Sequence, residues 1–414
     1  MSNEASAIEK LSLGTLFLLS LAIAYFATAT LDVLPNLLLM EVAATFQTTL
    51  GAASQIRTFT SIATFATALL MGFLSVRFKH KSLLLTGVGF MLISSLGCFF
   101  ALTLSWMQFY YSLNGVGSAM VLPMALALIG DYLPLEKRAK AVGYMVAMAP
   151  LSFFISVPIT GVLANFGDWR LVPLLFAVPF SVVGLLLAFF GLPASAHKQS
   201  STVTKKAYLR SFKQVFLNKS ATACLVGNIL RTAAYSATLY FGITFYRGIF
   251  SISLNLGTGL MMGGTLIFTL GSILGGRITN RFGRKTLTVA ASFLSGAFTM
   301  CLFLMPDFWM ALPFDYSEMF VAGIAFSAAT SLSLEQVPKS RGTMMSLNSA
   351  VLAAGGALAA AVGGAVLDLF SYEALGLTLG VTGVIAAAVF YFLTKDPSRT
   401  KLPVTKHLAA ESAA

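Results

Sequence analysis

Charged side chains are scarce in this chain. They make up 10% of its 414 residues, whereas hydrophobic residues make up 57%. Soluble domains carry about 25% charged residues, and so few charges do not cover the apolar surface of a water-soluble fold. No charged residue occurs from Ser82 to Gly130, which is room for two spans of about 20 residues each and a tight turn. A water-soluble fold is therefore excluded, and an α-helical membrane protein is expected.

Cysteine is also rare. Cys98, Cys224 and Cys301 each lie in an apolar run without paired spacing, which supports neither a disulfide framework nor a metal site. The sequence contains no G-x4-G-K-[S/T] phosphate loop, which argues against an ATP-driven pump. We therefore expect no cofactor, no bound metal and no enzyme activity.

Basic residues outnumber acidic residues, and the chain carries a net charge of +12. The apolar blocks predict twelve spans, at about 11–37, 50–76, 82–103, 107–131, 140–165, 170–192, 220–247, 256–280, 286–305, 312–337, 342–368 and 373–394. With the N-terminus inside, 23 of the 27 basic residues fall in cytoplasmic segments, and the exceptions are Arg57, Arg170, Arg231 and Arg247. This is the pattern of the positive-inside rule. The basicity thus indicates topology rather than nucleic-acid binding. We expect an integral protein of a bacterial or archaeal cytoplasmic membrane, with both termini in the cytoplasm.

An internal repeat relates the two halves of the chain. The loops from Gly72 to Lys81 and from Gly276 to Lys285 both read G-x4-R-F-x2-K and lie 204 residues apart, and Asp131 and Glu335 share this offset. The repeat predicts an all-α fold of two pseudo-symmetric six-helix bundles, at 1–192 and 220–394, with a cytoplasmic linker at 193–219 and a tail at 395–414. Parallel repeats of this kind place the solute site near the midplane between the halves.

The paired loops resemble the loop signature of the major facilitator superfamily. The segment from Pro134 to Ala141 and the segment from Gly167 to Arg170 also fit that family, and the segment from Pro150 to Gly161 is similar to the motif of its twelve-helix drug:proton antiporter branch. The sequence departs from the family patterns at four positions, namely Val76, Tyr111, Val157 and Asn280.

The resemblance implies a secondary transporter that works by alternating access. It implies that spans 1, 4, 7 and 10 line a central cavity and that spans 2, 5, 8 and 11 lie between the halves. Spans 8 and 11 are rich in glycine, which permits close backbone approach. The glycines could serve rocking of the halves or packing within one half. We expect a monomer.

Ionisable residues inside spans are costly in lipid and therefore indicate function. Asp32, predicted to be the only carboxylate clearly inside a span, lies near the outer end of span 1, and Arg57 lies near the outer end of span 2. Antiparallel neighbours place the two residues at similar depth, where they can form an ion pair. A buried carboxylate that alternates between desolvation and an opposite charge can bind and release a proton. We therefore expect proton coupling at Asp32 and Arg57; the alternative is a static pair that fixes the two helices.

Arg231 lies near the middle of span 7. A permanently charged group there needs an anionic or hydrated partner, which could be a substrate carboxylate or phosphate, Asp32 across the cavity, or water. Polar side chains inside the spans complete the predicted substrate site: Tyr25, Asn36, Tyr111, Asn114, Asn228, Tyr235 and Asn348. Each could instead form an interhelical hydrogen bond. As a set they favour an amphipathic solute over an inorganic ion or a sugar.

Two charged pairs at the cytoplasmic helix ends are predicted to form a gate. Arg77 and Asp131 belong to the first half, and Arg281 and Glu335 to the second. An arginine and a carboxylate can form a bidentate pair, and a pair made in only one conformation biases the conformational equilibrium. The alternative role is anchoring at the membrane interface.

These features favour a secondary active transporter, namely a proton-coupled exporter of amphipathic small molecules. Its partners are then the small-molecule substrate, protons and the lipid bilayer, with no nucleic acid. The alternative within transport is an organic-anion carrier that uses Arg231 as its charge anchor. A non-transporting membrane sensor is the alternative from a different class.

Overall fold

The computed structural model describes residues 2–193 and 212–396, so most of the predicted linker at 193–219 and nearly all of the tail at 395–414 lie outside the described residues. All regular elements within the described ranges are helical. Their bounds are α1 (Ser2–Asp32), α2 (Leu34–Leu37), α3 (Leu39–Thr45), α4 (Leu50–Arg77), α5 (His80–Phe100), α6 (Leu104–Tyr132), α7 (Leu135–Ala164), η1 (Pro173–Ala177), α8 (Val178–Gly191), α10 (Lys219–Phe250), α11 (Leu254–Phe282), α12 (Arg284–Leu304), α13 (Phe308–Gln336), η2 (Pro338–Ser340), α14 (Arg341–Leu369) and α15 (Tyr372–Leu393).

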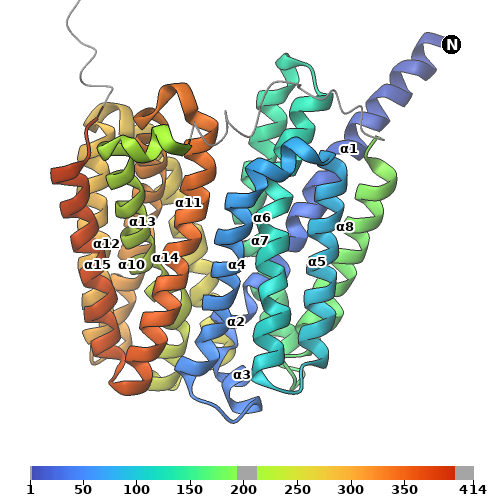
Figure 1. Ribbon diagram of the computed structural model, residues 1–414. Coiled ribbons are helices and arrows are strands. Elements are labelled where there is room, and N and C mark those ends of the chain that lie inside the picture. Colours follow the sequence, from blue (N-terminus) through green and yellow to red (C-terminus); the bar gives the residue numbers. More distant parts are fainter. Residues whose placement is uncertain (1, 194–211, 397–414) are drawn as a thin grey trace, which may run out of the picture.

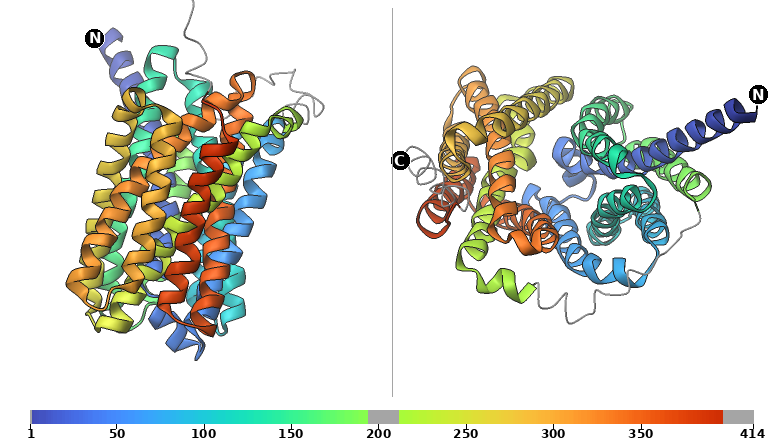
Figure 2. Two further views of the ribbon diagram at one scale, coloured as in Figure 1. Left: turned by 90° about the vertical axis from the view of Figure 1, so that its left-hand side faces the viewer. Right: turned by 90° about the horizontal axis from the view of Figure 1, so that it is seen from above.

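The helices form two bundles that stand side by side. Elements α1 to α8 make up one bundle and α10 to α15 the other, with the long helices roughly parallel (Figures 1 and 2). The predicted all-α membrane fold of two six-helix halves is therefore confirmed. We call the end of the molecule that carries Arg77, Lys137, Arg281 and Lys285 the basic end, and the end that carries α2 and α3 the opposite end.

Eleven helical segments in the described ranges are long and apolar enough to cross a membrane. The remaining long helix of the second bundle, α10, is not among them, although its 32 residues are ample for a span. Three polar side chains near its middle, on Asn228, Arg231 and Ser236, are buried. Because α10 packs against α13, α14 and α15, these polar groups face protein rather than lipid.

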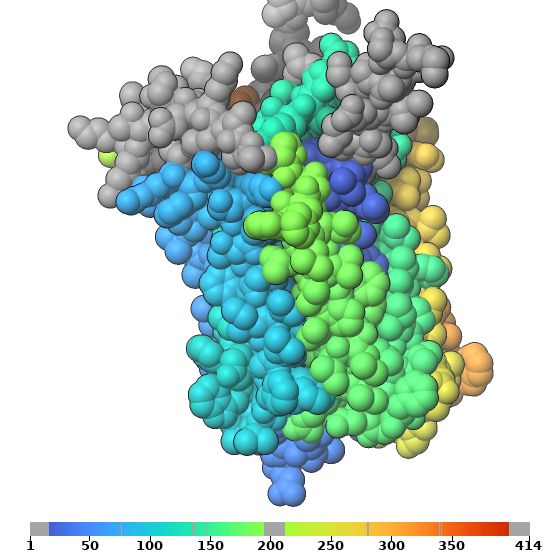
Figure 3. Space-filling model, turned by 90° about the vertical axis from the view of Figure 1, so that its right-hand side faces the viewer, coloured from blue at the N-terminus to red at the C-terminus, as the bar shows by residue number. Residues whose placement is uncertain are grey.

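The outer surface of the bundles is apolar, as a lipid-facing surface must be. On the face in Figure 3, α5 and α8 lie side by side. Large apolar side chains at the ends of these two helices are exposed, including Phe100, Phe189 and Phe190. A soluble monomer rarely exposes large contiguous apolar patches, so these side chains fit contact with lipid tails.

The two halves meet along α4 and α14 and along α7 and α11. These are the second, eleventh, fifth and eighth spans, as the family resemblance implied. The backbones of α4 and α14 approach so closely that a Cβ on Gly51 would overlap the Gly364 carbonyl. The glycines of α11 act differently, because a Cβ on Gly271 or Gly275 would overlap the backbone of α13 in the same half. Packing within one half therefore explains these α11 glycines.

Candidate functional site

The first span is broken beside Asp32. Pro35 has no N–H to donate to the carbonyl of Leu31, four residues earlier, so α1 ends at Asp32 and a short second helix begins at Leu34. The amide of Asn36 turns to the Val33 carbonyl at 3.1 Å. The carbonyls of both Leu31 and Asp32 therefore lack their usual backbone donors.

Side chains from two other helices satisfy these carbonyls. The Tyr111 hydroxyl of α6 donates to the Leu31 carbonyl at 2.6 Å, and the Arg57 guanidinium of α4 donates to the Asp32 carbonyl through Nη2. Buried backbone acceptors are costly when left unpaired. The break in α1 therefore fixes this helix to α4 and α6.

The carboxylate of Asp32 lies in the same network. Its Oδ1 accepts a hydrogen bond from Asn114 Nδ2 at 3.0 Å and lies 3.6 Å from Arg57 Nη1. The Arg57 Nε and Nη2 atoms also donate to Asn36 Oδ1, at 3.1 and 2.7 Å. The Asp32 side chain is 26% exposed, whereas the Arg57 side chain is 10% exposed.

Arg57 also links the two halves. Its guanidinium carbon lies 5.1 Å from the ring centre of Tyr240 on α10, a distance typical of a cation–π contact. The predicted residues Asp32, Arg57, Asn36, Tyr111 and Asn114 are thus brought together at one place. Tyr25 is half-buried and interacts electrostatically with Asp32.

A second polar cluster lies within the second half. Asn228 Nδ2 donates to Asn348 Oδ1 and to the Ser333 hydroxyl, at 3.0 Å each. Arg231 is 3% exposed and donates through Nε to Asn228 Oδ1 at a long 3.4 Å. The predicted residue Tyr235 stacks on Phe268 of α11, with ring centres 5.1 Å apart. Asn228, Arg231 and Asn348 therefore form an interhelical network.

Two buried carboxylates were not predicted from the sequence. Asp315 is 6% exposed and Glu318 is fully buried, and both lie inside α13. The prediction that Asp32 is the only carboxylate clearly inside a span is therefore wrong, because both residues fall within the predicted span at 312–337. Arg231 interacts electrostatically with Glu318. This partner was not among the three considered for Arg231.

The predicted gate pairs are not made in this conformation. Asp131 pairs instead with His80 Nδ1 at 2.7 Å, and Glu335 pairs with Arg284 at 3.6 Å. His80 and Arg284 are again 204 residues apart, so the two halves repeat one carboxylate contact between the loop and the end of their fourth helix. In each half, the carboxylate contacts the loop residue three positions after the predicted arginine. The predicted pairing is wrong for this state, and the observed pairs anchor loops within a half.

The lysine that ends each loop signature caps the last helix of its own half. Lys81 Nζ donates to the Phe189 carbonyl at 2.7 Å, and Lys285 Nζ donates to the Thr394 carbonyl at 2.8 Å. A cation is favourable at a helix C-terminus. These contacts explain the lysine in both copies of the signature.

An ion pair between the halves lies at the opposite end of the molecule. Arg247, at the end of α10, makes a bidentate pair with Glu41 of α3, at 2.6 and 3.0 Å. Nearby, Asp368 of α14 accepts hydrogen bonds from the Thr49 hydroxyl and the Gly51 amide, at 2.6 and 2.8 Å. We call these two contacts the outer lock. Sequence reasoning missed it, although Arg247 stood out as an exception to the positive-inside rule.

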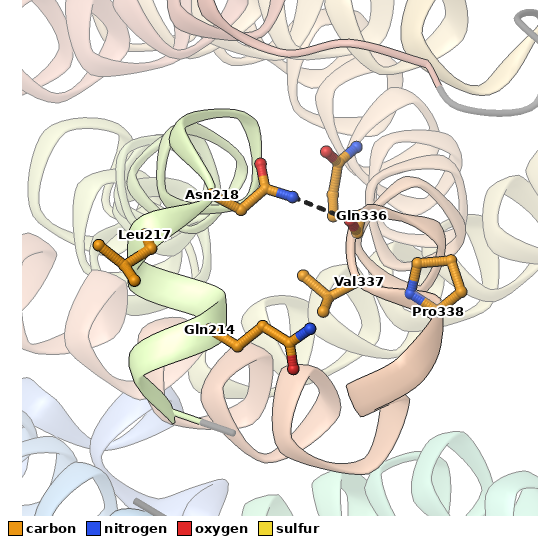
Figure 4. Close-up of a pocket in the computed structure, with 6 residues that line it drawn as sticks. All are labelled: Gln214, Leu217, Asn218, Gln336, Val337 and Pro338. Carbon is orange, nitrogen blue, oxygen red and sulfur yellow. Dashed lines mark hydrogen bonds between the residues drawn. The ribbon is translucent and has the colours of Figure 1, made fainter. Parts of the chain in front are cut away.

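A pocket opens at the basic end of the second half, away from both polar clusters. It has a volume of about 530 Å³ and is lined by Gln214, Leu217, Asn218, Gln336, Val337 and Pro338 (Figure 4). Asn218 donates to the Gln336 carbonyl at 3.1 Å and caps the start of α10 through its side-chain oxygen. The lining carries no ionisable side chain. We therefore do not place the substrate site here.

Comparisons with known proteins agree with this architecture. A sequence model described as the Major Facilitator Superfamily matches residues 17–334 and 265–412. The Bacillus subtilis (strain 168) protein named Uncharacterized MFS-type transporter YceJ is 23% identical, over 77% of this chain and 80% of its own length. Multidrug resistance protein 2 of the same organism is also 23% identical, over 71% of this chain and 74% of its length. The crystal structure of a point mutant of the nucleoside transporter NupG has a TM-score of 0.76 and 16% identity, covering 92% of this chain and 100% of that chain.

Proposed function

Because the chain belongs to the major facilitator superfamily, we propose that it exports amphipathic small molecules in exchange for protons. It is an integral membrane transporter. The basic end is cytoplasmic, as the distribution of Lys and Arg favours. A relative named Multidrug resistance protein 2 supports export of this substrate class.

The network around Asp32 carries the proposal. The Asp32 carboxylate faces Arg57. The same guanidinium donates to the Asp32 carbonyl at the broken end of α1 and contacts the Tyr240 ring of the other half. A proton that neutralises Asp32 removes one of the interactions that hold Arg57 in place, beside its hydrogen bonds to the Asp32 carbonyl and to Asn36. The guanidinium then rearranges against Asn36 and Tyr240, so that proton binding acts on a contact between the halves. Such differential contact is what couples a ligand to a conformational equilibrium.

The contacts between the halves support an inward-open conformation. Among the described residues, every hydrogen bond and ion pair that joins the halves lies toward the opposite end, from Leu37 to Gln55 and at Asn165 in the first half. One apolar core contains residues of both halves, whereas toward the basic end the first half has a core of its own and the second half has another, against which Leu69 of α4 packs. With the basic end in the cytoplasm, the outer lock closes the external side.

The alternative function, an organic-anion carrier that binds its substrate through Arg231, has less support than the proton-coupled exporter. Arg231 is 3% exposed, is hydrogen-bonded to Asn228 and interacts electrostatically with Glu318. A substrate anion would have to displace these neighbours. Their presence favours a role of Arg231 within the second half.

Transport in proteoliposomes tests the proposal. A thermal-shift panel of cationic, neutral and anionic amphipathic compounds first identifies a ligand, since ligands stabilise the folded state that binds them. An imposed pH gradient should then drive that compound in wild type. Asp32→Asn should abolish the driven transport while binding persists. Wild-type rates for Asp32→Asn would return Asp32 to a structural role.

A further inference from the structure

Within the part of the chain that the structure describes, the buried carboxylate of Glu318 has no counter-ion in contact with it. Its Oε1 accepts a hydrogen bond from the Ser295 hydroxyl of α12 at 2.7 Å, while its Oε2 is buried without any hydrogen-bond partner. None of the ion pairs found in the described ranges includes Glu318 or Asp315. An ionised carboxylate with a single donor is very unfavourable in such a place.

The neighbours of Glu318 come from several helices. Arg231 and Tyr235 of α10 and Asp315 of α13 interact with it electrostatically, and α12 contributes Ser295. The other helices packed on α13 are α11 and α14, whose titratable residues lie at their ends, at Arg277, Arg281, Arg341 and Asp368. The basic residues of α12, Arg284 and Lys285, lie at its start. Among the described residues, Arg231 is therefore the cation that interacts with Glu318.

The internal repeat relates Glu318 to the proposed coupling site. Glu318 follows Asn114 by 204 residues, and Asn114 is the donor to the Asp32 carboxylate. In the first half the carboxylate lies on the first helix and its amide partner on the fourth. In the second half the fourth helix carries the carboxylate, and the position equivalent to Asp32 is Ser236. Each half thus has one carboxylate at this pair of equivalent positions.

We propose that Glu318 is a second proton-binding site, with Arg231 as its counter-charge. In this conformation Glu318 is neutral, with the proton on the unpartnered Oε2. In another arrangement of the halves, the O–H bond breaks and the proton passes to water. The Arg231 guanidinium, held here by one long hydrogen bond, then neutralises the carboxylate. The inference rests on the proposed function, because it assigns to the exporter two proton sites instead of one.

A proton count on purified protein in detergent tests this without any substrate. Protons released between acid and alkaline pH are measured with an indicator dye, and infrared difference spectra follow the carbonyl band of protonated carboxyl groups. As the pH rises, wild type should lose one carbonyl band of a protonated carboxyl group, and Glu318→Gln should not show this band at any pH. The variant should also release one proton fewer than wild type. Glutamine keeps the size of the side chain and an oxygen for Ser295, so the variant should fold. Arg231→Gln should release fewer protons at a given alkaline pH, because the carboxylate loses its counter-charge.

Asp315→Asn is the matched control, since it removes the neighbouring buried carboxyl of the same helix. It should leave the band assigned to Glu318 in place. An unchanged proton count and spectrum in Glu318→Gln would overturn the proposal, as would a band that wild type retains at every pH. A thermal shift by sodium chloride over choline chloride, present in wild type and lost in Glu318→Gln, would make the site a sodium site instead.

The two proposals fail in distinguishable ways. If a pH gradient does not drive transport in wild type, yet Glu318→Gln still releases one proton fewer, the exporter is wrong and the proton site stands. If the gradient drives transport and Glu318→Gln titrates like wild type, only the second site is wrong.

Discussion

Four arginines lie outside the predicted cytoplasmic segments, and each has an identifiable partner. Arg57 binds the broken end of α1 and the Asp32 carboxylate. Arg170 donates to the Ala101 carbonyl at 3.1 Å, and Arg247 pairs with Glu41. In the described ranges, Arg231 has one long hydrogen bond, to Asn228, and an electrostatic interaction with Glu318.

The hydroxyl of Tyr111 gives the first prediction. Tyr111→Phe leaves the Leu31 carbonyl without its donor and should lower the free energy of unfolding by about 1–3 kcal/mol, the range for an unsatisfied buried group. Thermal unfolding in detergent measures the change. Tyr110→Phe is the control, because the Tyr110 ring stacks on Trp106 and no hydrogen bond of its hydroxyl occurs among the described residues. Equal effects of the two substitutions would contradict the assigned role.

Sequence reasoning recovered the pairing of Asp32 with Arg57 but not the position of Glu318 or the outer lock. The first follows from the depth of two residues on adjacent antiparallel helices. Glu41 and Arg247, in contrast, belong to different halves, and no sequence spacing reports how the halves dock. Glu318 could have been found, because it lies within the predicted tenth span.

At the scale of single elements, the break in α1 is the feature with most consequences. Pro35 releases two carbonyls, and their donors come from α4 and α6. The sequence contains the proline, but a proline alone does not say which side chains replace the lost backbone bonds. That depends on packing, which places Tyr111 and Arg57 around the break.

A double-mutant cycle follows from this account. In Pro35→Ala the alanine amide can donate to the Leu31 carbonyl, so the helix no longer needs the Tyr111 hydroxyl. In the Pro35→Ala background, Tyr111→Phe should lower the free energy of unfolding by less than about 1 kcal/mol. In the wild-type background the same substitution should lower it by about 1–3 kcal/mol. Thermal unfolding of the four proteins gives the coupling. Additivity within about 0.5 kcal/mol would show that the two sites are independent.

At the scale of the whole molecule, we expect the outer lock to favour the conformation in which it is made. Glu41→Gln removes the charge that faces Arg247 and should shift the population away from this conformation by about 1.5–3 kcal/mol, as for a hydrogen bond to a charged group. Spin labels at positions 137 and 340, introduced as Lys137→Cys and Ser340→Cys in a chain without its native cysteines, report the separation of the basic ends. Their distance should shorten in Glu41→Gln.

The charge-swapped double variant, Glu41→Arg with Arg247→Glu, is the matched control for this shift. It restores an ion pair across the same gap and should return the distances toward those of wild type. A distribution that stays the same in Glu41→Gln would make the pair an anchor rather than a lock.

The polar middle of α10 has a consequence for how the protein is made. An arginine at the centre of a helix opposes insertion into the bilayer by about 2.5–3.5 kcal/mol, and α10 is the long helix of the second bundle that fails the hydropathy criterion of a span. Its buried polar groups find partners on α13 and α14, which leave the ribosome later. A chain truncated after Ser251 should therefore insert α10 poorly, and Arg231→Leu in that truncated chain should restore insertion. Glycosylation sites engineered on either side of α10 measure this, and efficient insertion of the truncated wild-type helix would show that α10 enters the membrane before its partners.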